Sequence, residues 1–278
     1  MPVKENFEWK TKDGEKIFSQ KWLADGASKA IFVLVHGLGE HLGRYNHIAE
    51  FFNQHQISIY AFDHRGHGKS SGKRGHIGSS QLFMSDMDVM IEYAKKENPS
   101  VPIFLYGHSM GGNMVLYYTL NKKTALNGVI CTSPGIAVGE PIPPMKLFAA
   151  KILKNLFPTF LMDNGLDIDN LSHNSQVIKE YKEDPLVHPM VSVKLAMDTL
   201  SNGDFILHEA EKFSIPLLLL QGEKDHIVNQ EKTRQFAAKV PDPIITFKIF
   251  PELYHELHNE FEQEQVFFVI LEWINQHC

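Results

Sequence analysis

The sequence predicts an α/β protein whose mainly parallel sheet carries helices on both faces. Short apolar segments rich in β-branched residues recur along the chain, which is typical of strands that are buried on both sides. Segments with helical periodicity lie between most of them, and this alternation favours parallel strands joined by crossover helices. The expected strands cover residues 30–35, 57–62, 103–106, 128–132, 216–221 and 244–250. The expected helices cover residues 79–96, 113–120, 231–239 and 261–276.

Two other parts of the chain depart from this alternation. Residues 7–9 and 16–22 are separated by a short turn, so we expect an N-terminal β-hairpin. Residues 135–203 contain no convincing core strand and are rich in Pro, Met, Phe and Leu. Because a structureless loop of that length is unusual inside a compact domain, the segment predicts an inserted helical cap. The core domain is then expected to consist of residues 1–134 and 204–278.

One segment of the expected cap has the pattern of an amphipathic helix. Its apolar residues follow i, i+3, i+4, i+7 spacing, with Lys151 and Lys154 on the opposite side and Lys146 at the edge. These apolar residues are Met145, Phe148, Ala149, Ile152, Leu153 and Leu156. We expect them to pack on the body as a lid. An additional contact with a membrane surface stays open as an alternative, because amphipathicity alone does not separate the two roles.

Composition narrows the classes of protein that need to be considered. Hydrophobic residues make up 43% of the chain and charged residues 22%, as in ordinary globular proteins. The net charge is -6 and the basic residues are scattered, so no nucleic-acid partner is expected. No segment reaches the roughly 20 apolar residues that span a bilayer, and residues 1–10 lack the apolar region of a secretory signal. Cys131 and Cys278 form no disulfide framework, so we expect a cytoplasmic protein of open oligomeric state.

The most informative motif is G-x-S-x-G, formed by Gly107, His108, Ser109, Met110 and Gly111. It directly follows an expected strand and directly precedes an expected helix. This is the context of the nucleophile elbow in the α/β-hydrolase fold, and it predicts a serine hydrolase. A Cβ at either flanking glycine is expected to collide with neighbouring chain. We therefore interpret Ser109 as a nucleophile and not as a simple turn residue.

A serine hydroxyl is a weak nucleophile near neutral pH, so Ser109 needs a histidine base and an acid that orients it. In this fold the acid and then the histidine follow the serine, each on a loop after a later strand. Asp225 follows the expected strand 216–221, and His255 follows the expected strand 244–250. The weaker candidates are Glu223 and Asp242 for the acid, and His226 and His258 for the base. The sequence thus predicts the triad Ser109, Asp225 and His255.

Acyl transfer also needs hydrogen-bond donors for the oxyanion of the tetrahedral intermediate. In this architecture they are the backbone N–H after the nucleophile, here Met110, and one from a loop after an early strand. The glycine-rich turn at residues 36–39 suggests Leu38 for the second donor. The histidine-rich segment 63–68 precedes the serine, so we expect it to brace loops, and we expect His108 to pack against the sheet. This chemistry requires neither a cofactor nor a metal.

Taken together, these motifs resemble the monoacylglycerol lipase and lysophospholipase family. The resemblance extends from about Phe7 to the last helix and includes Asp184-Pro185-Leu186 and residues 146–156 in the cap. The segments that carry it are residues 36–41 with Arg44-Tyr45, residues 62–70, residues 107–112 and residues 254–258. The positions of the family's triad and oxyanion donors fall on the five residues that the spacing had already indicated.

The resemblance implies an ester substrate with one long acyl chain and a small polar alcohol, most simply a monoacylglycerol cleaved to fatty acid and glycerol. It implies that Phe148 and Ile152, with Met145 and Leu156, line a channel for the acyl chain. The alcohol is then expected to meet Glu40, Arg44 and His258. As an alternative, Glu40 and Arg44 only pair with each other at the start of a helix.

Other activities of the same fold stay open at this point. A lysophospholipase, a general carboxylesterase or a thioesterase would use the same three residues. Epoxide hydrolases and dehalogenases of this fold resemble one another in using an aspartate at the elbow, and Ser109 argues against both. A protein that keeps the fold for binding alone is disfavoured because the serine, acid and histidine all occur in the expected order.

Overall fold

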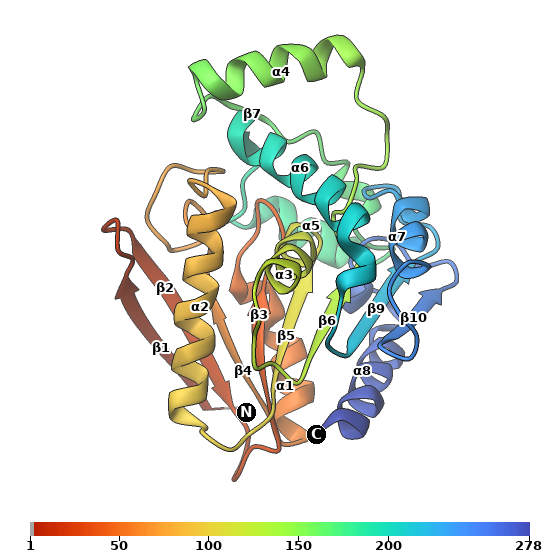
Figure 1. Cartoon of the computed structure of the whole chain (residues 1–278). Coiled ribbons are helices and arrows are strands. Elements are labelled where there is room, and N and C mark those ends of the chain that lie inside the picture. The colour runs from red at the N-terminus through yellow and green to blue at the C-terminus, as the bar shows by residue number, and fades with distance from the viewer. Residues whose placement is uncertain (1–2) are drawn as a thin grey trace.

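The structure is a computed structural model that describes residues 3–278. Its centre is an eight-stranded sheet in the order β1-β2-β4-β3-β5-β6-β9-β10, in which the neighbours from β4 to β10 are parallel and β2 is antiparallel to both β1 and β4 (Figure 1). The strands are β1 (Val3–Lys10), β2 (Lys16–Leu23), β3 (Ala30–Val35), β4 (Ile57–Phe62), β5 (Ile103–His108), β6 (Gly128–Thr132), β9 (Leu217–Gly222) and β10 (Ile245–Phe250). The predicted mainly parallel sheet is confirmed.

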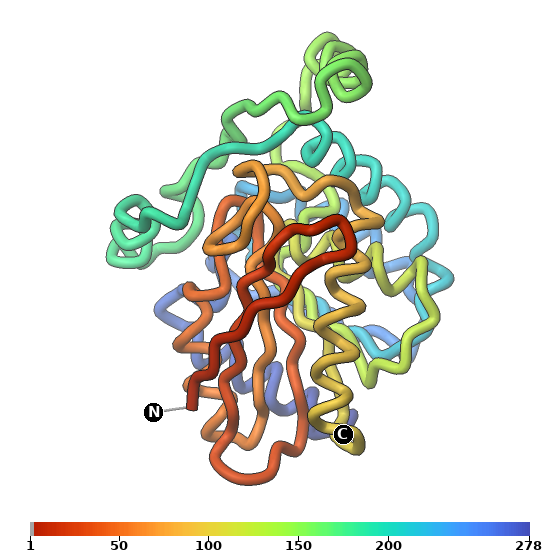
Figure 2. Tube along the Cα trace, turned by 90° about the vertical axis from the view of Figure 1, so that its left-hand side faces the viewer, coloured from red at the N-terminus to blue at the C-terminus, as the bar shows by residue number. Residues whose placement is uncertain are grey.

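The N-terminal hairpin is confirmed as well, and it is longer than predicted. β1 and β2 pair over their whole length, from Val3 opposite Leu23 to Lys10 opposite Lys16. Figure 2 shows the hairpin in red at the edge of the molecule that faces the viewer. β1 is an edge strand with mostly exposed side chains, and it carries several charges, which discourage pairing with another chain.

Helices cover both faces of the sheet, and each face has its own apolar core. On one face α2 (Ser80–Glu97), α3 (Met110–Asn121) and α7 (Gln230–Ala237) pack on the sheet, and on the other α1 (Asn46–Gln54) and α8 (Gln263–His277) do so. The central strands are therefore apolar along their whole length; all six residues of β3 are buried. Helix α1, which follows the 3-10 turn η1 (Leu42–Tyr45), was not predicted.

A long insertion between β6 and β9 lies above the carboxyl ends of the strands (Figure 1). It contains α4 (Pro144–Leu156), β7 (Leu161–Asp163), η2 (Ile168–Asn170), α5 (Ser175–Glu183), β8 (Met190–Ser192), α6 (Val193–Glu209) and η3 (Ala210–Lys212). The short strands β7 and β8 pair with each other in a separate two-stranded sheet. The division into residues 135–203 and a core stays a prediction; helix α6 runs through its boundary at 203.

Helix α4 forms where the sequence predicted it, but its apolar face points to solvent. Met145, Phe148, Ile152 and Leu156 are 83%, 66%, 46% and 66% exposed. In both views α4 projects at the top of the molecule (Figures 1 and 2). The side that faces the body instead carries Lys154, whose Nζ lies 2.7 Å from Oδ1 of Asp198 on α6. The expectation that the apolar face packs on the body is thus wrong, because periodicity defines the faces of a helix but not which one turns inward.

No helix among residues 3–278 combines the length and the apolar character that crossing a membrane requires.

Candidate active site

The nucleophile elbow places Ser109 between β5 and α3 in a strained backbone conformation. Ser109 has φ 55° and ψ -119°, in a region that a non-glycine residue rarely occupies, and its N–H donates to Thr132 O at 3.1 Å. A Cβ on Gly107 would lie 2.6 Å from the carbonyl oxygen of Gly111, and one on Gly111 would collide with the carbonyl of Val35. The crowding expected at both glycines is therefore present.

Ser109, His255 and Asp225 form one hydrogen-bonded chain. His255 Nε2 lies 2.9 Å from Ser109 Oγ, and His255 Nδ1 lies 2.8 Å from Asp225 Oδ2. Because the Nδ1–H donates to the carboxylate, Nε2 is the nitrogen that can accept the serine proton. The side chains of His255 and Asp225 are 3% and 0% exposed, so bulk water does not compete for either contact.

The weaker candidates lie elsewhere. Glu223 and Asp242 are exposed on the surface, and so is His226, which follows Asp225 in the chain. His258 is completely buried and stacks on the ring of Tyr45, with centroids 5.0 Å apart. None of these four side chains contacts Ser109 or His255 through a hydrogen bond in the described part of the chain.

The Asp225 carboxylate accepts four hydrogen bonds. Oδ1 accepts from the backbone N–H groups of Ile227 (2.8 Å) and Val228 (3.1 Å). Oδ2 accepts from His255 and from Gln221 Nε2 at 2.9 Å. Burial alone would raise the pKa of Asp225, but His255 and the backbone N–H groups of Val228 and Ile227 hold that pKa below its ordinary value. The carboxylate of Asp225 therefore stays ionised next to His255.

The environment of His255 favours its protonated form. Burial alone would lower the pKa of His255, but the Asp225 carboxylate, with help from Glu256 and Glu40, raises that pKa above its ordinary value. By contrast, burial and the nearby His255 lower the pKa of His108 to about 3. His108 is 1% exposed, and its Nδ1 lies 3.0 Å from Thr132 Oγ1, as expected for a residue that packs against the sheet.

The raised pKa of His255 predicts an acid limit to activity. Only neutral imidazole can accept the proton of Ser109, so kcat/KM should fall about tenfold for each pH unit below the pKa of His255 in the free enzyme. Because this pKa is raised, the midpoint should lie above the value of about 6.5 for an unperturbed histidine. A profile of kcat/KM on a soluble short-chain ester between about pH 5 and 9 measures it. A midpoint below that of free imidazole would contradict the assignment.

Leu38 and Met110 both line the cavity next to Ser109, as the two expected oxyanion donors should. Neither of their backbone N–H groups donates a hydrogen bond within residues 3–278, so both are free to receive a substrate oxygen. Two carboxylates fix the loop that carries Leu38 through hydrogen bonds to its backbone. Gly37 N–H donates to Glu40 Oε1 at 2.6 Å, and Leu42 N–H donates to Asp63 Oδ1 at 2.9 Å.

The histidine-rich segment braces this loop, as expected. The rings of His36 and His64 stack with centroids 3.5 Å apart, and the His64 N–H donates to His36 Nε2 at 3.1 Å. Burial, followed by neighbouring histidines, keeps the pKa of both rings well below the ordinary value, so they act as neutral spacers. Nearby, Arg65 binds Asp86 through Nε and Nη2.

Two of the three residues expected to meet the alcohol, Glu40 and Arg44, form a buried ionic cluster with Glu256. Arg44 donates to Glu40 Oε2 at 2.7 Å and to both carboxylate oxygens of Glu256 at 2.6 and 2.7 Å. Although burial alone would raise it, Arg44 holds the pKa of Glu256 at about 2. Glu40, Arg44 and His258 are not among the residues that line the cavity. The alternative, pairing of Glu40 with Arg44 at the start of a helix, agrees with the structure, since Glu40 precedes η1 and Arg44 lies within it.

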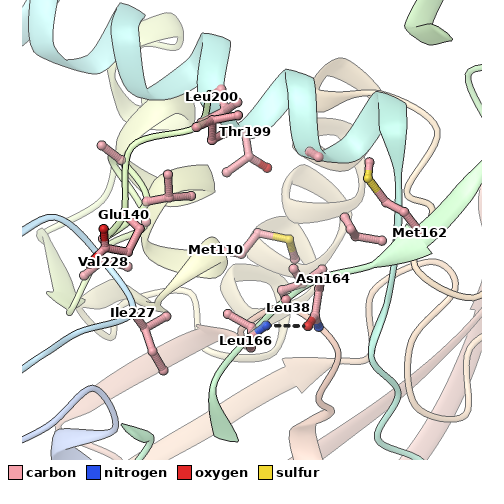
Figure 3. A pocket seen from close by; sticks show the side chains of 18 of the residues that line it. Leu38, Met110, Glu140, Met162, Asn164, Leu166, Thr199, Leu200, Ile227 and Val228 are labelled. Atoms are coloured by element: carbon pink, nitrogen blue, oxygen red, sulfur yellow. Dashed lines mark hydrogen bonds between the residues drawn. The ribbon is translucent and has the colours of Figure 1, made fainter. Parts of the chain in front are cut away.

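A cavity of about 950 Å³ lies between the insertion and the carboxyl ends of the strands, and Ser109 lines it. Figure 3 shows Met110 and Leu38 close together in it, with Met162, Leu200, Ile227 and Val228 around them. From α4 the lining residues are Lys146, Leu147 and Ala150. Phe148 and Ile152, which were predicted to line the acyl channel, are not among them, because they lie on the opposite, exposed side of α4.

Three partners of Asp225 were not predicted from the sequence, namely Gln221 and the backbone of Ile227 and Val228. The two backbone donors could not be found by residue type, because any residue supplies an N–H group. Gln221 did leave a signal, since it is the one polar side chain after four consecutive leucines in β9. Within residues 3–278, no group of three or more His, Cys, Asp or Glu side chains could hold a metal ion.

A sheet of this topology, with a strained serine at the end of its central strand and a histidine and an aspartate aligned behind it, defines a serine hydrolase of the α/β-hydrolase fold. The chain matches the family described as serine aminopeptidase, S33 (Hydrolase_4), over residues 26–262. It belongs to that family.

Several relatives are similar to the chain over most of its length. A monoacylglycerol lipase from Mycolicibacterium smegmatis is 32% identical, over 95% of this chain and 94% of its own. The crystal structure of Paleococcus ferrophilus monoacylglycerol lipase is 36% identical with a TM-score of 0.87, over 94% of this chain and 99% of its own. An uncharacterized abhydrolase domain-containing protein from Dictyostelium discoideum is 37% identical over 96% of this chain, which spans only 28% of that relative.

Proposed function

We propose that this enzyme hydrolyses carboxylic esters of one long acyl chain and a small polar alcohol, most simply monoacylglycerols, with Ser109, His255 and Asp225 as its triad. The observation that carries the proposal is the hydrogen-bonded chain of 2.9 and 2.8 Å that ends at the floor of a largely apolar cavity. The relatives named monoacylglycerol lipase support the substrate class.

The reaction follows from the geometry in two half-reactions. His255 Nε2 takes the proton of Ser109 Oγ while Oγ attacks the ester carbonyl, and Asp225 stabilises the imidazolium that forms. The backbone N–H groups of Leu38 and Met110 bind the oxyanion of the tetrahedral intermediate. His255 then protonates the alcohol as it leaves, and a water molecule activated by the same histidine releases the fatty acid from Ser109.

The cavity favours a long acyl chain over a polar substrate. Most of its walls are aliphatic or methionine side chains, so binding an acyl chain removes apolar surface from water on both partners. The charged residues that line it are Glu140, Lys146, Asp163 and Asp167. All four lie in the insertion between β6 and β9.

A substrate panel tests the proposal with the purified protein. We expect kcat/KM to be highest on a long-chain monoacylglycerol, and lower on a lysophospholipid, on a short p-nitrophenyl ester and on an amino acid p-nitroanilide. If kcat/KM were highest on the lysophospholipid, the preferred alcohol would be a phospholipid head group and not glycerol. If it were highest on the p-nitroanilide, the aminopeptidase activity in the family's description would be favoured. Covalent labelling of Ser109 by a fluorophosphonate is expected, and its absence would favour a binding protein without turnover.

The exposed face of α4 supports peripheral contact with a lipid surface as part of this function. Met145, Phe148, Ile152 and Leu156 lie beside Phe157 and Phe160, which are 61% and 54% exposed. Contiguous exposed apolar side chains of this size are costly in water and typical of interaction sites. Lys146 and Lys151 on the same helix are exposed and suit an anionic interface. An insertion over residues 135–203 would then deliver lipid to the cavity beneath it. A cytoplasmic location is also part of the proposal.

Substitutions at two neighbouring residues of α4 test separately whether this helix lines the acyl site and whether it contacts a lipid surface. Leu147→Ser places a hydroxyl in the cavity, so it should lower kcat/KM on long-chain esters several-fold more than on short ones. Phe148→Ser changes only the exposed side, so it should leave the hydrolysis of a soluble ester unchanged and reduce binding to phospholipid vesicles. Kinetics over acyl length and vesicle co-sedimentation measure the two effects. Equal losses on long and short esters in Leu147→Ser would contradict the acyl site.

A further inference from the structure

Gln221 interrupts an otherwise apolar strand and contacts the acid of the triad. It follows four leucines in β9 and is 1% exposed. Its Nε2 donates to Asp225 Oδ2 at 2.9 Å and makes a longer contact of 3.3 Å with Gly222 O. An apolar residue would continue the buried strand without any unpaired polar atom, so packing does not explain a glutamine here.

The surroundings of Gln221 fix the orientation of its amide. Turned over, the amide would place Oε1 against the carboxylate oxygen of Asp225, so that two acceptors faced each other. With Nε2 in that place, Oε1 is buried and has no hydrogen-bond partner among residues 3–278. A buried carbonyl oxygen without a partner destabilises the fold. The hydrogen bond from Nε2 to Asp225 therefore forms even though it leaves Oε1 buried and unpaired, which lowers the stability of the fold.

Gln221 and His255 share one oxygen of Asp225. The backbone N–H groups of Ile227 and Val228 hold Oδ1, whereas the donors to Oδ2 in the described structure are the side chains of Gln221 and His255. The contact with His255 changes during turnover, because the imidazole gains and loses a proton. Gln221 is thus the donor to Oδ2 that stays the same throughout the cycle.

We propose that Gln221 is a positioning residue of the triad: its Nε2–H holds Oδ2 of Asp225 in line with His255 Nδ1 and takes up part of the negative charge on that oxygen. The inference rests on the proposed function of Ser109, Asp225 and His255. A hydrogen bond to a carboxylate disperses its charge and stabilises its ionised form. Without this donor, Oδ2 would be less well aligned with His255 and would attract the imidazolium more strongly.

Gln221→Met tests the proposal, because methionine keeps a similar volume and removes the donor. We expect kcat to fall about tenfold with KM nearly unchanged, since one hydrogen bond to a charged group is lost. We also expect the midpoint of the acid limb of kcat/KM to move to higher pH, and the downfield proton resonance of His255 Nδ1–H to shift. Gln221→Leu, a second variant, also removes the donor and should move the midpoint in the same direction.

Gln230 provides a matched control. Its Nε2 also donates to Asp225, at 2.8 Å, but to the main-chain oxygen and not to the carboxylate. Gln230→Met should therefore keep the acid limb and the Nδ1–H resonance of the wild-type enzyme. The proposal is overturned if folded Gln221→Met has wild-type kcat and acid limb, or if both variants lose activity equally without a change in pH profile. If the proposed function itself were wrong, the fluorophosphonate would not label Ser109 of the wild-type protein. This result distinguishes that failure from a failure of the inference about Gln221.

Discussion

Ser109→Ala should abolish ester hydrolysis and leave the fold intact. The loss in kcat is expected to be on the order of 10⁶, as when the nucleophile of a comparable triad is removed. In the structure Ser109 Oγ contacts His255 and contributes nothing to the two apolar cores. The backbone strain at this position does not depend on the hydroxyl, so alanine can adopt the same conformation. Turnover of a chromogenic ester and thermal unfolding measure the two parts of this expectation.

Ser133 offers a control for that experiment. It lies just after the neighbouring strand β6, has a positive φ of 43°, and its buried hydroxyl has no partner among residues 3–278. Ser133→Ala removes the same atom from a similar backbone outside the proposed triad, so activity should persist. If Ser109→Ala kept full activity, or if Ser133→Ala abolished it, the proposed nucleophile would be wrong.

Asp225→Asn should lower kcat by several orders of magnitude, on the order of 10⁴ by comparison with other triads. An amide nitrogen in place of Oδ2 cannot accept the Nδ1–H of His255, so the imidazole takes the wrong tautomer or turns away from Ser109. KM should change little, because Asp225 does not line the main cavity. Steady-state kinetics on one soluble ester, with folding checked by circular dichroism, measures the effect.

Glu223→Asn and Asp242→Asn serve as comparisons, since both residues are acids near the same strands but exposed. Each should retain near wild-type kcat. Near-normal rates in Asp225→Asn would redirect the search for the acid to Glu223, which lies on the same turn. A large loss in either surface variant would show that the hydrogen bond between Asp225 and His255 does not carry the function proposed for it.

Much of the architecture could be predicted because local patterns determine it. The buried strands are continuous apolar runs, so β3, β4 and β6 were predicted with the bounds that the structure has. Ser109, Asp225 and His255 were chosen because parallel strands bring their carboxyl ends to one edge, where loops far apart in sequence meet. The structure brings the same three side chains within hydrogen-bond distance.

Features that depend on tertiary contacts could not be predicted in this way. The apolar stripe of α4 was assumed to face inward, yet Phe148 and Ile152 are exposed, and Lys154 pairs with Asp198 on the side towards the body. Glu40 and Arg44 were assigned to the alcohol on the strength of the family resemblance. Glu256, which neutralises Arg44 in the buried cluster, is 212 positions away from Arg44 in the sequence and gave no local signal.

The ionic cluster around Arg44 also constrains how the enzyme folds during its synthesis. One carboxylate partner of Arg44 lies in the first fifth of the chain, and the other comes directly after His255, close to the carboxyl terminus. A nascent polypeptide that has emerged from the ribosome only as far as β9 therefore lacks both the base and the second anion that Arg44 requires. Hydrolytic competence should therefore appear abruptly, once the segment that carries His255 and Glu256 has emerged and docks.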